Sequence, residues 1–571
     1  MTESPKRLPS YRIYPHTFAP THPLGIKPSG NAFFEEDLKE VEKHKQKLLG
    51  KFGKFPEDLL IHLISFIESP RDLLALGSAS RVFYAYTYSE ELWRKFYVDE
   101  FTRLEENQDP ASTSPCPFDC KNWKGSWRKT LLKTDVEALV KTNGLVFSDY
   151  LYRPYQCSQI DFEYLFRKVV DLEAKSRDLG HTLNSDFGVA RIDEAALTLQ
   201  DFEVHHINKP FILQSSSRAE RWPQWNLKNL VDKFGNTKFR QEAVKWTLSF
   251  YSDYFSQNYD ESPLYLFDCN SVAIQALKKE YEAPKIFQND LFKVFQEGEV
   301  QCRPDHRWLI IGPQGSGSTF HKDPNYTSAW NTVLTGKKLW IMLPPDVKPP
   351  GVSTDEDEEE VTSPIGVAEW VLSGFYNDAV KLAQDGKCLI TVTFPGECIY
   401  VPSGWWHTVI NLTDSVALTE NFVPEPVLPK TLLFFSSKRR QLSGFHLEDT
   451  LKALRKFLES NKPTEDPESR SNFYKIKKFL TNCENQQIDN RDCGLSESDP
   501  ELPIFEFFVE LLRLSKFGAN LDSALASMRA MKSEAERESQ KLVTPATKIS
   551  GTWTALAAES KNAFSFGFDL N

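Results

Sequence analysis

The chain of 571 residues has no run of about 18 consecutive apolar residues, the length that a membrane-spanning helix requires. Its first residues, MTESPKRLPSYRIYPHTF, have no apolar stretch of the kind found in secretory signals, so we expect no such signal. Its nine cysteines, an odd number scattered along the chain, favour reduced intracellular thiols over a disulfide framework. A net charge of -11 argues against a surface that coats nucleic acid, and we expect no direct nucleic-acid binding.

What the chain does contain is enough apolar material for several globular domains. Hydrophobic residues make up 40% of it and aromatic residues 13%. Shifts in composition predict an α+β multidomain protein with six parts: an irregular arm and charged helix at 1–50, a helical module at 51–100, a connecting segment at 101–200, a β-rich domain at 201–430, a helical C-terminal region at 431–542 and a flexible tail at 543–571.

Apolar residues recur at helical spacing after Pro56, a residue that suits the first turn of a helix. Ser69-Pro70 ends this helix, and two more helical runs follow. The segment resembles an F-box through Pro56, Leu59-Leu60, Asp72-Leu73, Ser80-Arg81 and Leu92-Trp93. The resemblance implies a small module that docks on the Skp-type adaptor of a cullin ubiquitin ligase through an apolar face. A three-helix packing module with no ligase partner stays open as the alternative.

The connecting segment carries Trp123 and Trp127, one helical turn apart. We expect these two rings to pack the F-box-like module against the next domain. Because no long Gly/Ser run separates the modules, we expect them to be packed together and not flexibly tethered.

From about Phe202 the pattern changes to short β-rich runs bounded by Pro, Gly and Asn, which favours a sandwich or barrel. A jelly roll of the cupin class would close most of its sheet edges. The runs are KPFILQ, SPLYLFD, HRWLIIGP, KKLWIMLPP, CLITVTF, ECIYVP, HTVINL and SVALTENF. After Pro429 the pattern becomes helical, and the helices either cover the barrel or form a dimer.

His321, Asp323 and His407 are the candidate metal ligands. Two residues that lie two apart on an extended strand leave the same face, and His407 follows several predicted strands later. Two imidazoles and one carboxylate form the facial triad that binds Fe(II) and leaves three coordination positions open. On residue types alone, a chance surface His-x-Asp pair and a core histidine remain the alternatives.

Residues 202–425 resemble a Jumonji C domain, in particular that of the lysyl hydroxylase and phosphatidylserine-receptor family. The shared pieces are PLYLFD, APKIF with DLF, RWLIIGPQGSGS, HKDP, TSAWN, GKKLW, GECIYVPSGWWH and VINL through TENF. The resemblance implies a double-stranded β-helix that binds Fe(II) and uses 2-oxoglutarate and dioxygen. It implies that His321, Asp323 and His407 are the metal ligands and catalytic residues.

The same resemblance assigns the cosubstrate pocket. Lys338 matches a lysine that pairs with the distal carboxylate of 2-oxoglutarate, and strand alternation lets only one of Lys337 and Lys338 point inward. Asn331, Thr419 and Tyr265 match positions that contact the cosubstrate or line its pocket, and Ser318 stands where the relative has threonine. The bland alternatives are a turn cap for Asn331, an ordinary strand position for Thr419 and a core position for Tyr265.

The leading hypothesis is a 2-oxoglutarate-dependent protein hydroxylase that acts on lysyl side chains. The alternatives are an N-methyl demethylase of histones or other proteins, and a ubiquitin-ligase substrate adaptor that uses the β domain only for binding. The expected partners are a protein substrate, a Skp-type adaptor and a second copy bound through the C-terminal helices, with no membrane. We expect an intracellular protein, and the nucleus is favoured over the cytoplasm.

Overall fold

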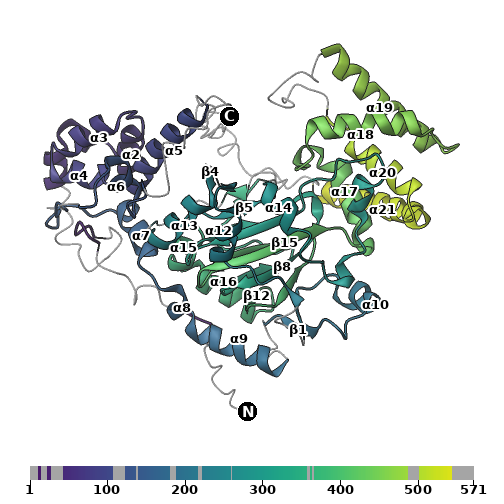
Figure 1. The fold of residues 1–571 in the computed structure, drawn as a ribbon, viewed down its shortest axis with the longest axis horizontal. Helices are drawn as coiled ribbons and strands as arrows, with labels where there is room; N and C mark the ends of the chain where they lie inside the picture. The colour runs from purple at the N-terminus through teal and green to yellow at the C-terminus, as the bar shows by residue number, and fades with distance from the viewer. Residues whose placement is uncertain are drawn as a thin grey trace.

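The computed structural model describes residues 11–13, 22–27, 43–106, 122–136, 139–180, 188–215, 221–242, 244–258, 260, 262–269, 271–355, 361–362, 366–486 and 501–542. Two β-sheets form its centre, with the F-box-like module on one side and the C-terminal helices on the other (Figure 1). The expected α+β architecture is therefore confirmed. Among the described residues, no helix combines the length and apolar character needed to span a membrane.

The F-box-like module has four main helices where the sequence predicts three. Ser69 and Ser80 each cap a helix by accepting a hydrogen bond from a backbone N–H, of Asp72 and Phe83 respectively. The short helix that Ser80 begins separates the second expected helix from the last one and was not expected. The elements are η3 (Gly50–Lys54), α2 (Glu57–Ser65), α3 (Pro70–Gly77), α4 (Arg81–Thr87) and α5 (Glu90–Glu106).

The connecting segment is packed between the modules, as expected. The rings of Trp123 and Trp127 are 5.0 Å apart and contact Tyr254 and Trp246 of the β-rich domain. One hydrophobic core runs without interruption from the F-box-like module into this domain. The helices of the connecting segment are α6 (Trp127–Leu132), α7 (Asp149–Ser158), α8 (Phe162–Leu165) and α9 (Arg167–Leu179).

Two sheets stack face to face as a double-stranded β-helix. The large sheet has the order β1-β2-β13-β8-β15-β6-β5-β3-β4, and the small sheet has the order β12-β9-β14-β7. Every pair is antiparallel except β1 with β2. A further antiparallel pair joins β10 to β11. Because β1 ends at Asp193, the large sheet starts before the expected domain boundary at 201.

Eight of the strands coincide with the β-rich runs of the sequence, whereas β1, β3, β4, β7, β8, β10 and β11 lie outside them. The strands are β1 (Ala190–Asp193), β2 (Phe211–Gln214), β3 (Lys238–Gln241), β4 (Val244–Thr247), β5 (Leu266–Asp268), β6 (Arg307–Gly312), β7 (Gly317–His321), β8 (Ser328–Thr335), β9 (Lys338–Leu343), β10 (Ser353–Thr354), β11 (Val361–Thr362), β12 (Leu389–Thr393), β13 (Cys398–Val401), β14 (Trp406–Asn411) and β15 (Ser415–Phe422).

Helices cover the outer faces of both sheets. A core beneath the small sheet includes residues of α9, α15 and α16, and another core lies between the two sheets. The helices inserted among the strands are α10 (Leu199–Asp201), η5 (Phe202–His206), α12 (Leu227–Phe234), α13 (Leu248–Gln257), α14 (Val272–Leu277), η6 (Lys285–Phe287), η7 (Leu291–Gln296), η8 (Pro324–Tyr326), α15 (Val367–Leu372), α16 (Phe375–Gln384) and η9 (Glu425–Val427).

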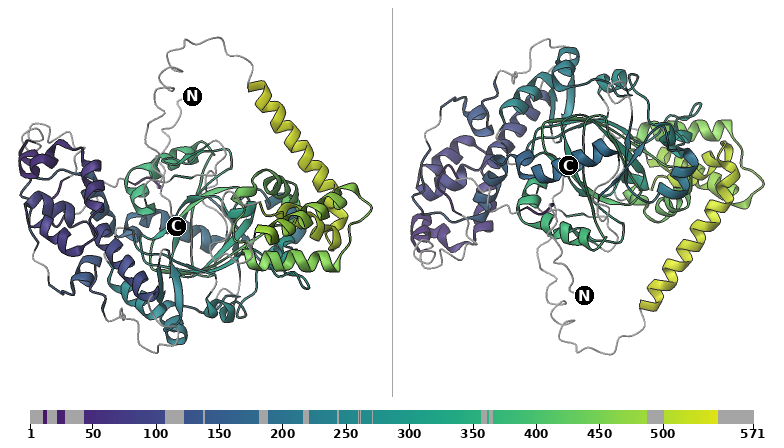
Figure 2. Two further views of the ribbon diagram at one scale, coloured as in Figure 1. Left: turned by 90° about the horizontal axis from the view of Figure 1, so that it is seen from above. Right: turned by 90° about the horizontal axis from the view of Figure 1, so that it is seen from below.

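The C-terminal helices form a separate core that rests on η7 and on the end of β15. They agree with the helical pattern expected after Pro429. Figure 2 shows α21 running outward from the others, and its residues 532–537 are exposed. The elements are α17 (Leu428–Ser437), η10 (Arg439–Gln441), α18 (Leu447–Ser460), α19 (Pro467–Gln486), α20 (Ile504–Leu514), η12 (Gly518–Asn520) and α21 (Leu521–Leu542). The expected flexible tail at 543–571 lies outside the described residues.

Candidate metal centre

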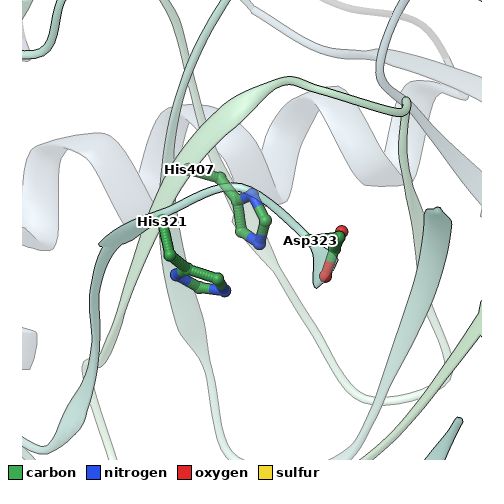
Figure 3. Close-up of side chains that lie close together, drawn as sticks. All are labelled: His321, Asp323 and His407. Carbon is green, nitrogen blue, oxygen red and sulfur yellow. The ribbon is translucent and has the colours of Figure 1, made fainter. Parts of the chain in front are cut away.

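The small sheet brings the two candidate histidines together. His321 is the last residue of β7, and it stands opposite His407 of β14 in the antiparallel register. Asp323 follows in extended backbone just before η8. One potential ligand atom from each of the three residues lies within 4.8 Å of the others, and Figure 3 shows the three side chains around one space. The spacing expected from the sequence thus produces a cluster with the size of a metal site.

Each imidazole is held by a backbone carbonyl in a way that suits metal binding. Nδ1 of His321 lies 2.8 Å from the carbonyl oxygen of Thr319, and Nδ1 of His407 lies 3.2 Å from that of Trp405. A proton on Nδ1 donated to these carbonyls leaves Nε2 of each ring as a lone-pair donor. Burial lowers the pKa of His407 well below its ordinary value, and the neighbouring His321 adds to this, so His407 is neutral.

Asp323 has one oxygen satisfied and one free for a cation. Asn421 Nδ2 donates to Asp323 Oδ1 at 3.2 Å and to Thr327 Oγ1 at 2.7 Å. The buried Oδ2 of Asp323 has no hydrogen-bond partner among the described residues. An unpaired buried carboxylate oxygen beside the neutral imidazole of His407 is unfavourable without a positive charge. The donor set fits Fe(II), and the assignment of its ligands stays a prediction.

Lys338 lies inside the β-helix and Lys337 outside it, which is the orientation that the resemblance to the Jumonji C family implies. Lys338 is 1% exposed, and its Nζ donates to Tyr265 Oη at 2.9 Å and to Asn411 Oδ1 at 2.8 Å. Lys337 instead pairs with Glu163. Burial lowers the pKa of Lys338 to about 7, since no carboxylate compensates its charge. An anion such as the distal carboxylate of 2-oxoglutarate would supply that compensation.

The other predicted contacts come from the large sheet. Asn331 of β8 and Thr419 of β15 are neighbours in the register, and both side chains line the same cavity as Lys338. Thr419 Oγ1 donates to the carbonyl oxygen of Trp330 at 2.8 Å, while Asn331 Oδ1 is buried without a partner among the described residues. Tyr265 and Ser318 line this cavity too. The structure therefore gathers all eight predicted residues, and their contacts with 2-oxoglutarate stay predictions.

The cavity that these residues line has a volume of about 990 Å³. We call the part formed by Asp323 and by the strand residues His321, Asn331, Lys338, His407 and Thr419 the inner cavity. We call the part formed by helix and turn residues Glu91, Arg94, Asp149, Glu242 and Glu369 the outer cavity. Because Glu91 and Arg94 belong to α5, the F-box-like module contributes to the wall of the same cavity as the candidate metal ligands.

Three asparagines of the site were missed in the sequence, although all lie in or beside the quoted motifs. Asn421 orients Asp323, and Asn411 accepts from Lys338. Asn325 Nδ2 donates to the carbonyl oxygen of Ser443 at 2.8 Å, and Ser443 N–H donates back to Asn325 Oδ1 at 3.0 Å. Asn325 and Tyr326 both have positive φ, of 56° and 55°, so this clamp holds a strained turn beside Asp323. No periodic pattern marks such residues.

Comparison with known proteins identifies two families in the chain. Residues 199–427 match the cupin-like domain, and residues 52–99 match the F-box-like family. The arginine-specific demethylase JMJ22 of Arabidopsis thaliana is 32% identical over 431 residues, which cover 73% of this chain and 76% of that protein. The bifunctional arginine demethylase and lysyl-hydroxylase psr-1 of Caenorhabditis elegans is 30% identical over 247 residues, covering 41% of this chain and 61% of psr-1.

A third relative bears on the cofactors. The 2-oxoglutarate and iron-dependent oxygenase JMJD4 of Mus musculus is 27% identical over 196 residues, which cover 34% of this chain and 44% of that protein. A double-stranded β-helix with two histidines and one aspartate at the cavity defines an iron- and 2-oxoglutarate-dependent oxygenase. The chain belongs to the Jumonji C family of these enzymes and carries an F-box-like module in addition.

Proposed function

We propose that this oxygenase acts on side chains of a protein substrate, with lysyl hydroxylation as the reaction and demethylation of N-methylarginine as the alternative. The observation that carries the proposal is the single cavity of about 990 Å³, which extends from the candidate metal ligands out to α5. A cavity of this size accommodates 2-oxoglutarate together with a long side chain. The names of psr-1 and JMJ22 support the two reactions, because each name includes one or both activities.

In this proposal His321, Asp323 and His407 would hold Fe(II) as a set of two imidazoles and one carboxylate. The bound iron supplies the oxidising chemistry: 2-oxoglutarate and dioxygen become succinate and carbon dioxide, and one oxygen atom enters a substrate C–H bond. Lys338 binds the distal carboxylate, and Tyr265 and Asn411 fix the position of its ammonium group. Asn331, Thr419 and Ser318 line the remaining wall of the cosubstrate pocket.

The two reactions share the iron chemistry and differ in the carbon that is positioned. Hydroxylation of a lysyl carbon gives a stable alcohol, whereas hydroxylation of an N-methyl group gives a hemiaminal that releases formaldehyde. The test incubates the full chain with Fe(II), 2-oxoglutarate and peptides that contain either lysine or N-methylarginine. Mass spectrometry then distinguishes a gain of one oxygen atom from the loss of a methyl group. A chain that forms neither product, although it binds iron and 2-oxoglutarate, contradicts the proposal.

A second function, docking on a Skp-type adaptor, is favoured by one surface of the F-box-like module. Five large apolar side chains on η3, α2 and the turn after α2 are exposed, and Phe66 is exposed to 64%. Clustered apolar groups of this kind mark a protein-binding site. The residues are Phe52, Phe55, Leu59, Leu63 and Phe66.

Co-purification of an adaptor with the wild-type chain, but not with Leu63→Asp, tests this role. Leu63 is 38% exposed, so the substitution should leave the fold intact, and a matched change at the half-buried Leu74 on α3 reports on misfolding. The ligase role fails if neither chain retains an adaptor. Residence in the nucleus and dimerisation through the C-terminal helices remain proposals, tested by localisation of the tagged chain and by its mass in solution.

A further inference from the structure

The outer cavity joins two modules that are far apart in the sequence. Arg94 of α5 pairs with Glu242 in the turn between β3 and β4 at 3.2 Å, and it also donates to the carbonyl oxygen of Ser262 at 3.5 Å. Glu242 Oε1 in turn accepts from the N–H of Tyr265 at 3.3 Å. Since the Tyr265 hydroxyl accepts from Lys338, a continuous set of contacts leads from the F-box-like module to the inner cavity.

This wall of the cavity is firmly placed. Glu90, at the start of α5, accepts hydrogen bonds from the N–H groups of Trp127 and Arg128 at 2.8 and 3.3 Å. Trp127 then donates to the buried Asp260 of the β-rich domain at 2.8 Å. These bonds, together with the shared apolar core, fix the orientation of α5 over the cavity. Side chains on α5 are therefore held in well-defined positions, as the selection of a substrate requires.

Two carboxylates of the outer cavity share one guanidinium. Its lining includes the carboxylates of Glu91 and Glu242 and the guanidinium of Arg94. Arg94 lies between Glu91, at 3.7 Å, and Glu242, so one cation serves two carboxylates. Partial burial raises the pKa of Glu242, although Arg94 acts in the opposite direction. A second cation placed here would stabilise its carboxylate further.

The inner cavity independently offers an unpaired polar atom to a ligand. Asn331 Oδ1 lines the cavity, its residue is only 6% exposed, and it has no partner among the described residues. The two parts of the cavity thus favour ligands of opposite charge. Lys338 in the inner cavity favours an anion, and the carboxylates of the outer cavity favour a cation.

We propose that α5 of the F-box-like module selects the substrate, with Glu91 and Glu242 receiving a basic side chain that flanks the reacting residue. Arg94 is a positioning residue that holds Glu242 and links α5 to the β-rich domain. This inference rests on the proposed function in one respect, namely that the substrate is a protein segment. It makes the F-box-like module part of the oxygenase, in addition to any adaptor that binds its exposed apolar surface.

The test measures binding of three synthetic peptides to the full chain loaded with Fe(II) and 2-oxoglutarate under argon. The peptides share a central lysine and length, and their flanking residues are arginine, serine or glutamate. Fluorescence anisotropy at low ionic strength gives each Kd. We expect the arginine-flanked peptide to bind most tightly, and Glu91→Gln to weaken it on the order of fivefold, as for a partly exposed ion pair. Glu91→Lys should reverse the order of the peptides.

The matched control is Asp99→Asn, an exposed acid on the same helix that does not belong to the cavity lining, and it should bind all three peptides as the wild type does. Absorption from the complex of iron with 2-oxoglutarate confirms that each variant is loaded. The inference is overturned if the wild type shows no preference for the arginine-flanked peptide, or if Glu91→Gln and Asp99→Asn behave alike. A preference for this peptide without product formation would contradict the proposed reaction alone.

Discussion

The inner and outer cavities are built in different ways. Residues of the inner cavity come from neighbouring strands, and backbone register holds them: His321 faces His407, and Asn331 faces Thr419. Those of the outer cavity come from α5, α7, α15 and a turn, and side-chain contacts such as the Arg94–Glu242 pair hold them. Catalytic groups must be positioned precisely, and the backbone register of a sheet provides this precision. Helices and turns can change more freely, so substrate selection can vary on the same scaffold.

The largest effect is expected at the inner cavity. Replacement of His407 by alanine removes one of two imidazole donors, and because the remaining two ligands bind iron weakly, turnover should fall below detection. The fold should persist, since β14 keeps its pairing with β7 and β9. The measurement is anaerobic titration with Fe(II) and 2-oxoglutarate, followed through the charge-transfer absorption of their complex. Full activity of this variant would show that His407 is not a ligand.

Lys338 makes the inner cavity sensitive to pH. Its pKa is lowered to about 7 in the free protein, and a bound carboxylate raises it again, so binding of 2-oxoglutarate above this pH takes up a proton. The apparent Kd for 2-oxoglutarate should therefore rise above about pH 7, by up to tenfold per pH unit, while the lysine deprotonates. Calorimetry in buffers of different ionisation enthalpy counts the protons taken up.

Two variants sharpen this prediction. Lys338→Arg keeps its charge throughout this range and should lose the pH dependence. Lys337→Ala should keep the pH dependence, because Lys337 pairs with Glu163 outside the inner cavity. Equal behaviour of the wild type and Lys338→Arg would show that another group causes the pH dependence.

A smaller effect is expected at the clamp between Asn325 and Ser443, which supports the inner cavity from the C-terminal region. Asn325→Ala removes both hydrogen bonds and leaves a residue with Cβ at a φ of 56°. Affinity for Fe(II) should fall about tenfold, as for other groups that orient a ligand. Asn325→Gly accepts the positive φ but loses the hydrogen bonds, so competition with a chelator separates strain from clamping. Unchanged affinity for Fe(II) in both variants would show that the clamp does not contribute to metal binding.

The smallest effect is expected at the outer cavity, from the Arg94–Glu242 pair. Both side chains are partly exposed, 16% and 43%, so solvent screens the pair. A double-mutant cycle of Arg94→Ala and Glu242→Ala should give a coupling free energy of about 0.5 kcal/mol in urea unfolding. A much larger coupling would indicate that these contacts fix the modules as strongly as register fixes the inner cavity.

The inner cavity could be read from the sequence because its residues obey local rules. His321 and Asp323 share a face through strand alternation, and the same rule lets only one of Lys337 and Lys338 point inward. Strands such as β9 and β15 were predicted because they are largely apolar runs. The strands β7 and β8 contain more Gly, Ser and Thr, so the apolar pattern did not predict them. The helix α4 was not predicted either, because it has only 7 residues after its serine cap.

By itself, then, the sequence determined the class of fold and the candidate metal ligands, because strand periodicity and residue chemistry act over short distances. The choice of Lys338 as the inward lysine came from the resemblance to the Jumonji C family. Only the tertiary structure decided that Glu91 and Arg94 line the cavity of the β-rich domain, and that Ser443 is hydrogen-bonded to Asn325. The partners in the pairs Arg94–Glu242 and Asn325–Ser443 are more than a hundred residues apart in the sequence, and no local pattern predicts their contact. Packing of whole modules, through one shared apolar core, brings them together.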